Sequence, residues 1–305
     1  MGVRIVTYFA WLACLLPVAA VCASEFSSQG ADACVVCHGA GMPQAAVAIF
    51  TTAHGSRQDA AAPFAQLQCE QCHGPAAEHL AAVSRGETAL PPVSFGAHAG
   101  TPAAVQDAAC LGCHDDHGRD GWMGSAHEAA EVPCAACHQV HAERDRVFDA
   151  LAQQETCFTC HARRRDDSLK PSSHPLRFGS MSCSSCHDPH NGQHESLLLE
   201  ASVNDTCFTC HAEKRGPFLW EHAPAAEDCS LCHQVHGSNH PPLLTRRAPL
   251  LCQQCHAAAD HPGLAYSDAD LEDPQANRFV LARGCLNCHS QVHGSNHPSG
   301  ATLHR

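Results

Sequence analysis

The pattern of apolar and polar residues predicts few regular elements beyond the first segment of the 305-residue chain. Residues 76–83 and 147–154 have the composition of short helices, whereas proline pairs at 91–92 and 241–242 mark turns or extended loops. No stretch shows the apolar–polar alternation that is typical of a half-buried strand. We therefore expect a mostly irregular chain with short α-helices and no sheet.

The first segment has the pattern of a secretory signal. Arg4 precedes an apolar run over residues 5–21, and Ala23 ends a cleavage site of small residues. This predicts a signal peptide over residues 1–23 and an exported mature chain over 24–305, with a retained membrane anchor as the alternative. No later run approaches the roughly 20 apolar residues of a membrane helix, so we expect no direct lipid span.

A five-residue motif, C-x-x-C-H, occurs ten times and defines cassettes 1 to 10. It is the attachment site of c-type haem, in which two thiols bind the vinyl groups and the histidine is the proximal iron ligand. The first cysteines are Cys34, Cys69, Cys110, Cys134, Cys157, Cys183, Cys207, Cys229, Cys252 and Cys285. The second cysteines are Cys37, Cys72, Cys113, Cys137, Cys160, Cys186, Cys210, Cys232, Cys255 and Cys288. The proximal histidines are His38, His73, His114, His138, His161, His187, His211, His233, His256 and His289.

These cassettes use every cysteine of the mature chain, since the remaining two of 22, Cys14 and Cys22, lie in the predicted leader. A single C-x-x-C is a weak signal, because zinc sites and redox dithiols also use it. Five four-cysteine zinc sites are the alternative, but they would not require a histidine after every second cysteine. The pattern predicts ten covalently bound haem c groups.

The composition does not provide an ordinary hydrophobic core, because aromatic residues make up only 5% of the chain. We expect ten stacked haems in an elongated chain to form the core instead. Without Arg4, 17 basic residues face 31 acidic ones, a net charge of −14. This balance disfavours nucleic acid and anionic membrane surfaces as partners.

Ten further histidines fit a repeated unit: a cassette, a mid-unit histidine, a second cassette and a histidine shortly after it. We predict that they are the distal iron ligands: His54, His79, His127, His141, His174, His190, His222, His236, His261 and His293. Other histidines, chiefly His98, His117 and His240, are the alternatives. In the spacing C-x-x-C-H-x-x-H the last histidine is too constrained to reach its own haem, so we expect it to cap a neighbouring one.

Two histidines on every iron have consequences for reactivity. A six-coordinate iron offers no position for a substrate, so the pattern favours an electron-transfer protein over an enzyme. Only three methionines remain in the mature chain, and histidine ligation without methionine indicates low potentials. A file of ten haems is either a wire or a charge store. A wire across a membrane would need a large β-barrel partner as a sheath, because a polar chain cannot face lipid.

Two runs resemble the MtrA-type (DmsE family) periplasmic decahaem c-type cytochromes: CLNCHSQVHGSNHPSG at 285–300 and HAEKRGPFLWEHAP at 211–224. The resemblance implies two similar pentahaem halves, about 24–165 and 166–305, with bis-histidine haems. It also implies a periplasmic protein held at the outer membrane by a large β-barrel porin. Electrons would pass between a periplasmic or inner-membrane cytochrome and an extracellular multihaem cytochrome or reductase.

Two other functions are left open by the sequence. One is a freely diffusing periplasmic electron shuttle, which would have the same cassettes and ligands. The other is a multihaem oxyanion reductase, which would need at least one iron without a distal ligand.

Overall fold

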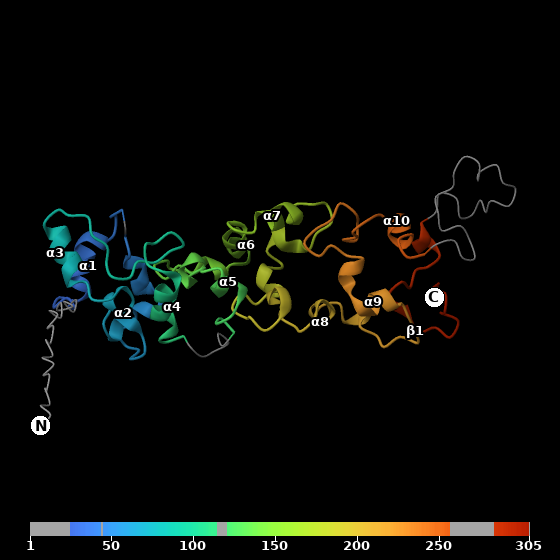
Figure 1. Ribbon diagram of the computed structural model, residues 1–305, viewed down its shortest axis with the longest axis horizontal. Helices are drawn as coiled ribbons and strands as arrows, with labels where there is room; N and C mark the ends of the chain where they lie inside the picture. Colours follow the sequence, from blue (N-terminus) through green and yellow to red (C-terminus); the bar gives the residue numbers. More distant parts are fainter. Residues whose placement is uncertain (1–24, 44, 115–120, 257–283, 305) are drawn as a thin grey trace, which may run out of the picture.

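The computed structural model describes residues 25–43, 45–114, 121–256 and 284–304. The chain is elongated, and its elements follow one another in sequence order from α1 near one end to the C-terminus at the other (Figure 1). The α-helices are α1 (Ala31–His38), α2 (Glu70–His73), α3 (Ala77–Ser84), α4 (Ala103–Leu111), α5 (Ala126–Ala129), α6 (Ala150–Phe158), α7 (Ala162–Ser168), α8 (Val203–Phe208), α9 (Ala223–Glu227) and α10 (Ala248–Cys252). The predicted signal peptide, residues 1–23, lies outside the described residues.

Short 3-10 helices provide most of the remaining order. They are η1 (Val47–Thr51), η2 (Ala53–Gly55), η3 (Pro63–Ala65), η4 (Cys134–Ala136), η5 (Arg146–Phe148), η6 (Pro175–Phe178), η7 (Cys183–Ser185), η8 (Glu195–Leu197), η9 (Ala212–Lys214), η10 (Cys229–Leu231) and η11 (Cys285–Asn287). The prediction of short helices in a largely irregular chain is therefore confirmed. Among the described residues, no helix is long and apolar enough to cross a membrane.

The predicted helix over 76–83 corresponds to α3. The one predicted over 147–154 begins later, at Ala150, because Asp149 caps α6. The Asp149 carboxylate accepts hydrogen bonds from the backbone N–H groups of Leu151 at 3.1 Å and Ala152 at 2.9 Å. The residues before this cap form the separate turn η5.

The expectation of no sheet was wrong in one detail. Strands β1 (Trp220–Glu221) and β2 (Gly294–Ser295) pair antiparallel, with Trp220 opposite Ser295. The pairing is too short to produce an alternating sequence pattern. Gly294, at φ +137°, makes it possible, because a Cβ there would overlap the ring of Phe218.

An equivalent clamp lies one unit earlier, where the same H-G-S-N-H-P sequence recurs. Ser238 forms an antiparallel bridge with Ser172, and Gly237, at φ +142°, lies directly against the backbone of Asp167. Each H-G-S-N-H-P loop is therefore pinned to the unit that precedes it. These clamps connect the units of the elongated molecule.

Few large side chains are buried within the described part of the chain. Phe64, Trp122, Phe158 and Leu244 are, whereas many apolar side chains face outward, including Phe178 at 76% exposure. Side-chain burial of this kind is insufficient to stabilise a fold of this length.

Candidate haem-binding sites

Each described cassette is folded as a single helical turn. In cassette 8 the backbone N–H groups of Cys232 and His233 both donate to the carbonyl of Cys229, at 3.2 and 2.9 Å. Positions i, i+3 and i+4 share one face of a helical turn, so the two thiols and the imidazole lie on the same side. Covalent attachment to one porphyrin requires this arrangement.

From cassette 3 onward the turns alternate in type. Odd-numbered cassettes begin within the last turn of α4, α6, α8 and α10, whereas even-numbered ones form η4, η7, η10 and η11. A buried polar residue lies three positions before three of the odd cassettes. Asp107 and Asn204 accept the backbone N–H of Cys134 and Cys229, at 2.8 and 2.7 Å, and Gln154 donates to a carbonyl before cassette 6. Each of these three odd cassettes is thereby connected to the even one that follows.

The first cysteines of consecutive cassettes come together in five pairs, in each of which one thiol shifts the pKa of the other. The pairs are Cys34 and Cys69, Cys110 and Cys134, Cys157 and Cys183, Cys207 and Cys229, and Cys252 and Cys285. The thiol of Cys157 lowers the pKa of Cys183 to about 7. The structure therefore groups the cassettes as 1–2, 3–4, 5–6, 7–8 and 9–10.

Second cysteines connect one pair to the next. Burial and then the thiol of Cys110 raise the pKa of Cys72 to about 11, which places cassette 2 beside cassette 3. Burial and then Cys210 raise the pKa of Cys186, and burial and then Cys255 raise that of Cys232. Burial, then Cys157 and Cys160, raise the pKa of Cys137, which places cassette 4 beside cassette 5. The ten cassettes therefore form one continuous file.

Nine of the ten cassette histidines face a second histidine, with ring centroids 5.9–6.5 Å apart. The pairs, cassette histidine first, are His38 and His79, His73 and His141, His114 and His54, His138 and His190, His161 and His127, His187 and His236, His211 and His174, His233 and His293, and His256 and His222. All nine second histidines belong to the set that the sequence predicts as distal ligands.

The pairing follows a rule that the sequence did not reveal. For even-numbered cassettes from 2 to 8, the partner is the histidine that follows the next even-numbered cassette. His187 of cassette 6, for example, faces His236, which follows cassette 8. In odd-numbered sites from cassette 3 to 9, the partner is the mid-unit histidine of the preceding unit, as His174 is for His211. No described C-x-x-C-H-x-x-H histidine faces its own cassette histidine, so these imidazoles join neighbouring units.

Hydrogen bonds at Nδ1 orient many of these rings. His187 and His233 each have a backbone carbonyl at this atom, from Ser196 at 2.9 Å and Pro242 at 3.0 Å. Among the second histidines, His222 contacts the Val292 carbonyl at 2.7 Å. A donor bond at Nδ1 fixes the ring and leaves Nε2 for a metal.

Burial keeps several of these rings neutral. It lowers the pKa of His236 to about 4, with a smaller contribution from Arg164, and it also lowers the pKa of His73, His141 and His293. A neutral imidazole has a lone pair for iron at neutral pH. The lowered pKa values therefore suit ligation.

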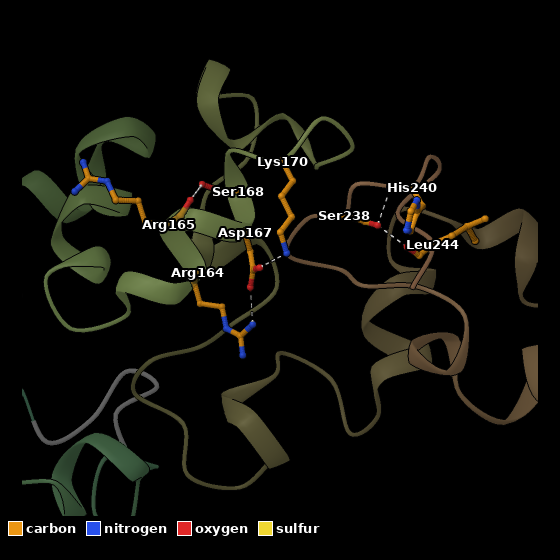
Figure 2. A network of polar contacts seen from close by, with 8 residues as sticks. All are labelled: Arg164, Arg165, Asp167, Ser168, Lys170, Ser238, His240 and Leu244. Atoms are coloured by element: carbon orange, nitrogen blue, oxygen red, sulfur yellow. Dashed lines mark hydrogen bonds and ion pairs between the residues drawn. The ribbon is translucent and has the colours of Figure 1, made fainter. Parts of the chain in front are cut away.

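A buried carboxylate pairs with two cations of its own segment of the chain. Asp167 accepts hydrogen bonds from Nζ of Lys170 at 2.6 Å and from Arg164 at 2.9 Å, and Figure 2 shows both side chains converging on it. In the loop that carries His236, the hydroxyl of Ser238 donates to the carbonyl of Leu244 and accepts the backbone N–H of His240 at 2.9 Å. Backbone hydrogen bonds between Ser172 and Ser238, at 3.0 and 2.7 Å, connect the two segments.

The tenth site is described in part. His261, its predicted distal ligand, lies outside the described residues, as does His117. His304 approaches His289 with Nε2 atoms 3.4 Å apart, which is too close for an iron between them. His98 is exposed, and His240 lies in the loop network instead of against a cassette histidine.

The zinc alternative needs three or four ligands around one ion. Within residues 25–43, 45–114, 121–256 and 284–304 no three Cys, His, Asp or Glu side chains gather in this way. The thiols of neighbouring cassettes meet in twos.

Comparison with known proteins agrees with the cassettes. The family model of the doubled CXXCH motif matches residues 174–216 and 222–261, and that of the NrfB-like cytochrome c-type proteins matches 69–152. The chain is 45% identical over 283 residues, 92% of its length, to the multiheme cytochrome MtrA of Shewanella baltica (strain OS185), of which it covers 83%. The chain belongs to the MtrA family of multihaem c-type cytochromes. As a member of this family it is an electron-transfer protein that binds haem c covalently.

Proposed function

We propose that this MtrA-family chain binds ten haem c groups, each with two histidine ligands, and conducts electrons along its length. The observation that carries the proposal is the spacing of the nine histidine pairs. Two metal–nitrogen bonds of about 2 Å, and nitrogens about 1.1 Å from the ring centres, give about 6.2 Å between centroids. The observed 5.9–6.5 Å fits an iron between the rings.

Haem iron supplies one-electron redox chemistry, and the residues of this chain determine how it is used. The two imidazoles at each of the nine described pairs would hold an iron from both sides, which would exclude substrates from the metal. The Nδ1 hydrogen bonds orient the rings for this role. These features support electron transfer over catalysis, including the oxyanion reductase alternative.

The continuous file supports conduction over storage in separate clusters. Cysteines shift one another's pKa within pairs and between pairs of cassettes, from cassette 1 to cassette 10, so consecutive cassettes lie close together. Porphyrins attached to these cysteines would lie beside one another. The elongated shape in Figure 1 spreads this file between the two ends of the molecule.

We place the protein in the periplasm, exported by the signal peptide 1–23 and held at the outer membrane by a large β-barrel porin. Family membership and the wire-like shape support this placement. Electrons would pass between a periplasmic or inner-membrane cytochrome and an extracellular multihaem cytochrome or reductase. The freely diffusing shuttle is the second candidate, because the same file would serve it.

Two measurements on the exported protein test the proposal. Mass spectrometry should show ten covalent haems, and addition of carbon monoxide to the reduced protein should leave the spectrum unchanged because no axial position is open. Binding of carbon monoxide to several haems would contradict bis-histidine ligation. Pull-down from detergent-extracted outer membranes should recover a large barrel, whereas its absence would favour the shuttle.

A further inference from the structure

The even-numbered cassettes offer an internal comparison at the Nδ1 atom of the proximal histidine. In four of them this atom contacts a backbone carbonyl: His73 with Val93 at 2.9 Å, His187 with Ser196 at 2.9 Å, His233 with Pro242 at 3.0 Å and His289 with Thr302 at 2.7 Å. In cassette 4 the partner is a carboxylate. Nδ1 of His138 lies 2.6 Å from Oδ2 of Asp145.

The Asp145 side chain is held in place. It is 15% exposed, and its second oxygen accepts the backbone N–H of Val147 at 3.3 Å, which caps η5. Because of this cap the carboxylate keeps its position beside the His138 ring. The His138 contact is therefore part of the local fold.

The opposite ligand of the same site also has a carboxylate nearby. His190 faces His138 with centroids 5.9 Å apart and an interplanar angle of 15°. Asp188 accepts the backbone N–H of His190 at 3.0 Å, and its carboxylate lies 3.8 Å from Nδ1 of that ring. The buried Trp122 packs against the His190 ring, with centroids 6.2 Å apart. Negative charge therefore flanks both ligands of site 4.

We propose that Asp145 is a positioning residue that gives the haem of cassette 4 a lower reduction potential than the haems of the other even-numbered cassettes. A carboxylate that accepts the Nδ1 proton increases the negative charge on the imidazole more than a carbonyl does. A more basic axial ligand stabilises ferric iron over ferrous iron. The inference rests on the proposed ligation of iron by His138 and His190.

Potentiometric titration of the ten-haem protein, followed by its visible spectrum, tests this role in the Asp145→Asn variant. The asparagine oxygen still accepts the Nδ1 hydrogen bond but carries no charge. We expect the redox equilibrium constant of one component to change by at least about tenfold toward the reduced form. This corresponds to a rise of about 59 mV in its midpoint potential for one electron. Asp149→Asn is the matched control, since it neutralises an exposed helix cap four residues away and should leave every midpoint unchanged.

A measurement on the unaltered protein keeps the proposal testable if the variant fails to assemble. The near-infrared charge-transfer bands of the ferric haems, followed by magnetic circular dichroism, should include a component at shorter wavelength than the main band. Ten equivalent bands, or unchanged midpoints in an Asp145→Asn protein with all its haems low-spin, would overturn the inference. Haem count and carbon monoxide binding report separately on the proposed function, so the two failures are distinguishable.

Discussion

Single histidines in this protein are defined by what each ring nitrogen contacts. The Nδ1 atoms of rings such as His174 and His222 hold backbone carbonyls of the following unit, Val235 at 3.1 Å and Val292 at 2.7 Å. Their Nε2 atoms remain for the metal. One hydrogen bond therefore both orients a ligand and joins two units, which couples haem binding to the packing of the chain.

Removal of one distal imidazole should leave one haem iron with an open coordination position. His236 faces His187 at 6.0 Å and is not part of a cassette, so His236→Ala should retain all covalent haems. We expect one haem to become high-spin when ferric and to bind carbon monoxide when ferrous. The control is His194→Ala, whose ring contacts the Leu198 carbonyl and no cassette histidine among those described. An entirely low-spin His236→Ala protein would contradict this assignment.

The sequence indicated which histidines lie beside cassette histidines better than it indicated which ring meets which. Nine predicted distal histidines lie against cassette histidines. They could be predicted because each has a characteristic spacing from the cassettes in the sequence. Which ring meets which depends on contacts between units, such as the bridge of Ser172 with Ser238, that have no local signal. Asp145 was missed for a similar reason. Its position seven residues after His138 stands out only beside the carbonyl partners of the other cassettes.

At the scale of elements, buried polar side chains connect consecutive cassettes. Asn204, at the start of α8, accepts the backbone N–H of Cys229 at 2.7 Å and donates to the carbonyl of Ala226 at 3.0 Å. Asp107 accepts from Cys134 in the same way, ahead of cassette 3. These residues share a position three residues before an odd cassette, but they differ in type, so the sequence alone does not reveal their common role.

Loss of this contact should destabilise the fold locally. Asn204→Ala leaves the Cys229 N–H without its partner in a buried position, which costs about 1–3 kcal/mol. We expect a lower thermal unfolding midpoint with the haems still attached. Asn204→Asp should recover part of the loss, because it keeps the accepting oxygen that Asp107 uses in the earlier unit but loses the donor to the carbonyl of Ala226. Equal unfolding midpoints for wild type and Asn204→Ala would show that the contact contributes nothing.

The ion pairs of α7 predict a dependence of stability on pH. Lys170 and then Arg164 hold the pKa of Asp167 below its ordinary value of 3.8. Because the folded pKa is the lower one, the carboxylate stabilises the fold above about pH 4 and loses this effect as the pH falls through the folded value. Asp167→Asn should lower the unfolding midpoint at pH 7, and the difference from wild type should shrink in acid. A difference that stayed constant down to pH 2 would contradict the pairing.

At the scale of the whole molecule, the arrangement is one file with two ends. Each interior cassette lies close to the one before and the one after it; for example, Cys210 of cassette 7, after burial, raises the pKa of Cys186 of cassette 6. The clamps at Ser172–Ser238 and at β1–β2 keep successive units in line. The two-residue β pair was not predictable from the sequence, whereas the repeated H-G-S-N-H-P loops that form both clamps were visible in it. The division into two pentahaem halves, 24–165 and 166–305, remains a prediction.

A single file predicts that an interior break is more damaging than a terminal one. Cys183→Ala with Cys186→Ala should remove one haem and slow the redistribution of electrons after pulsed reduction, because cassettes 5 and 7 lose their common neighbour. Removal of the terminal haem through Cys285→Ala and Cys288→Ala should leave redistribution among the other nine unchanged. Equal rates in the two variants would indicate parallel routes.

The position of the irons tests the central claim most directly. Anomalous diffraction from crystals of the haem-loaded protein at the iron edge should show ten peaks in one file, ordered as the cassettes are in the sequence. Nine of these peaks should lie about 2 Å from the Nε2 atoms of the histidine pairs described above. Fewer irons, irons gathered in separate clusters, or several irons with a single histidine would contradict the account.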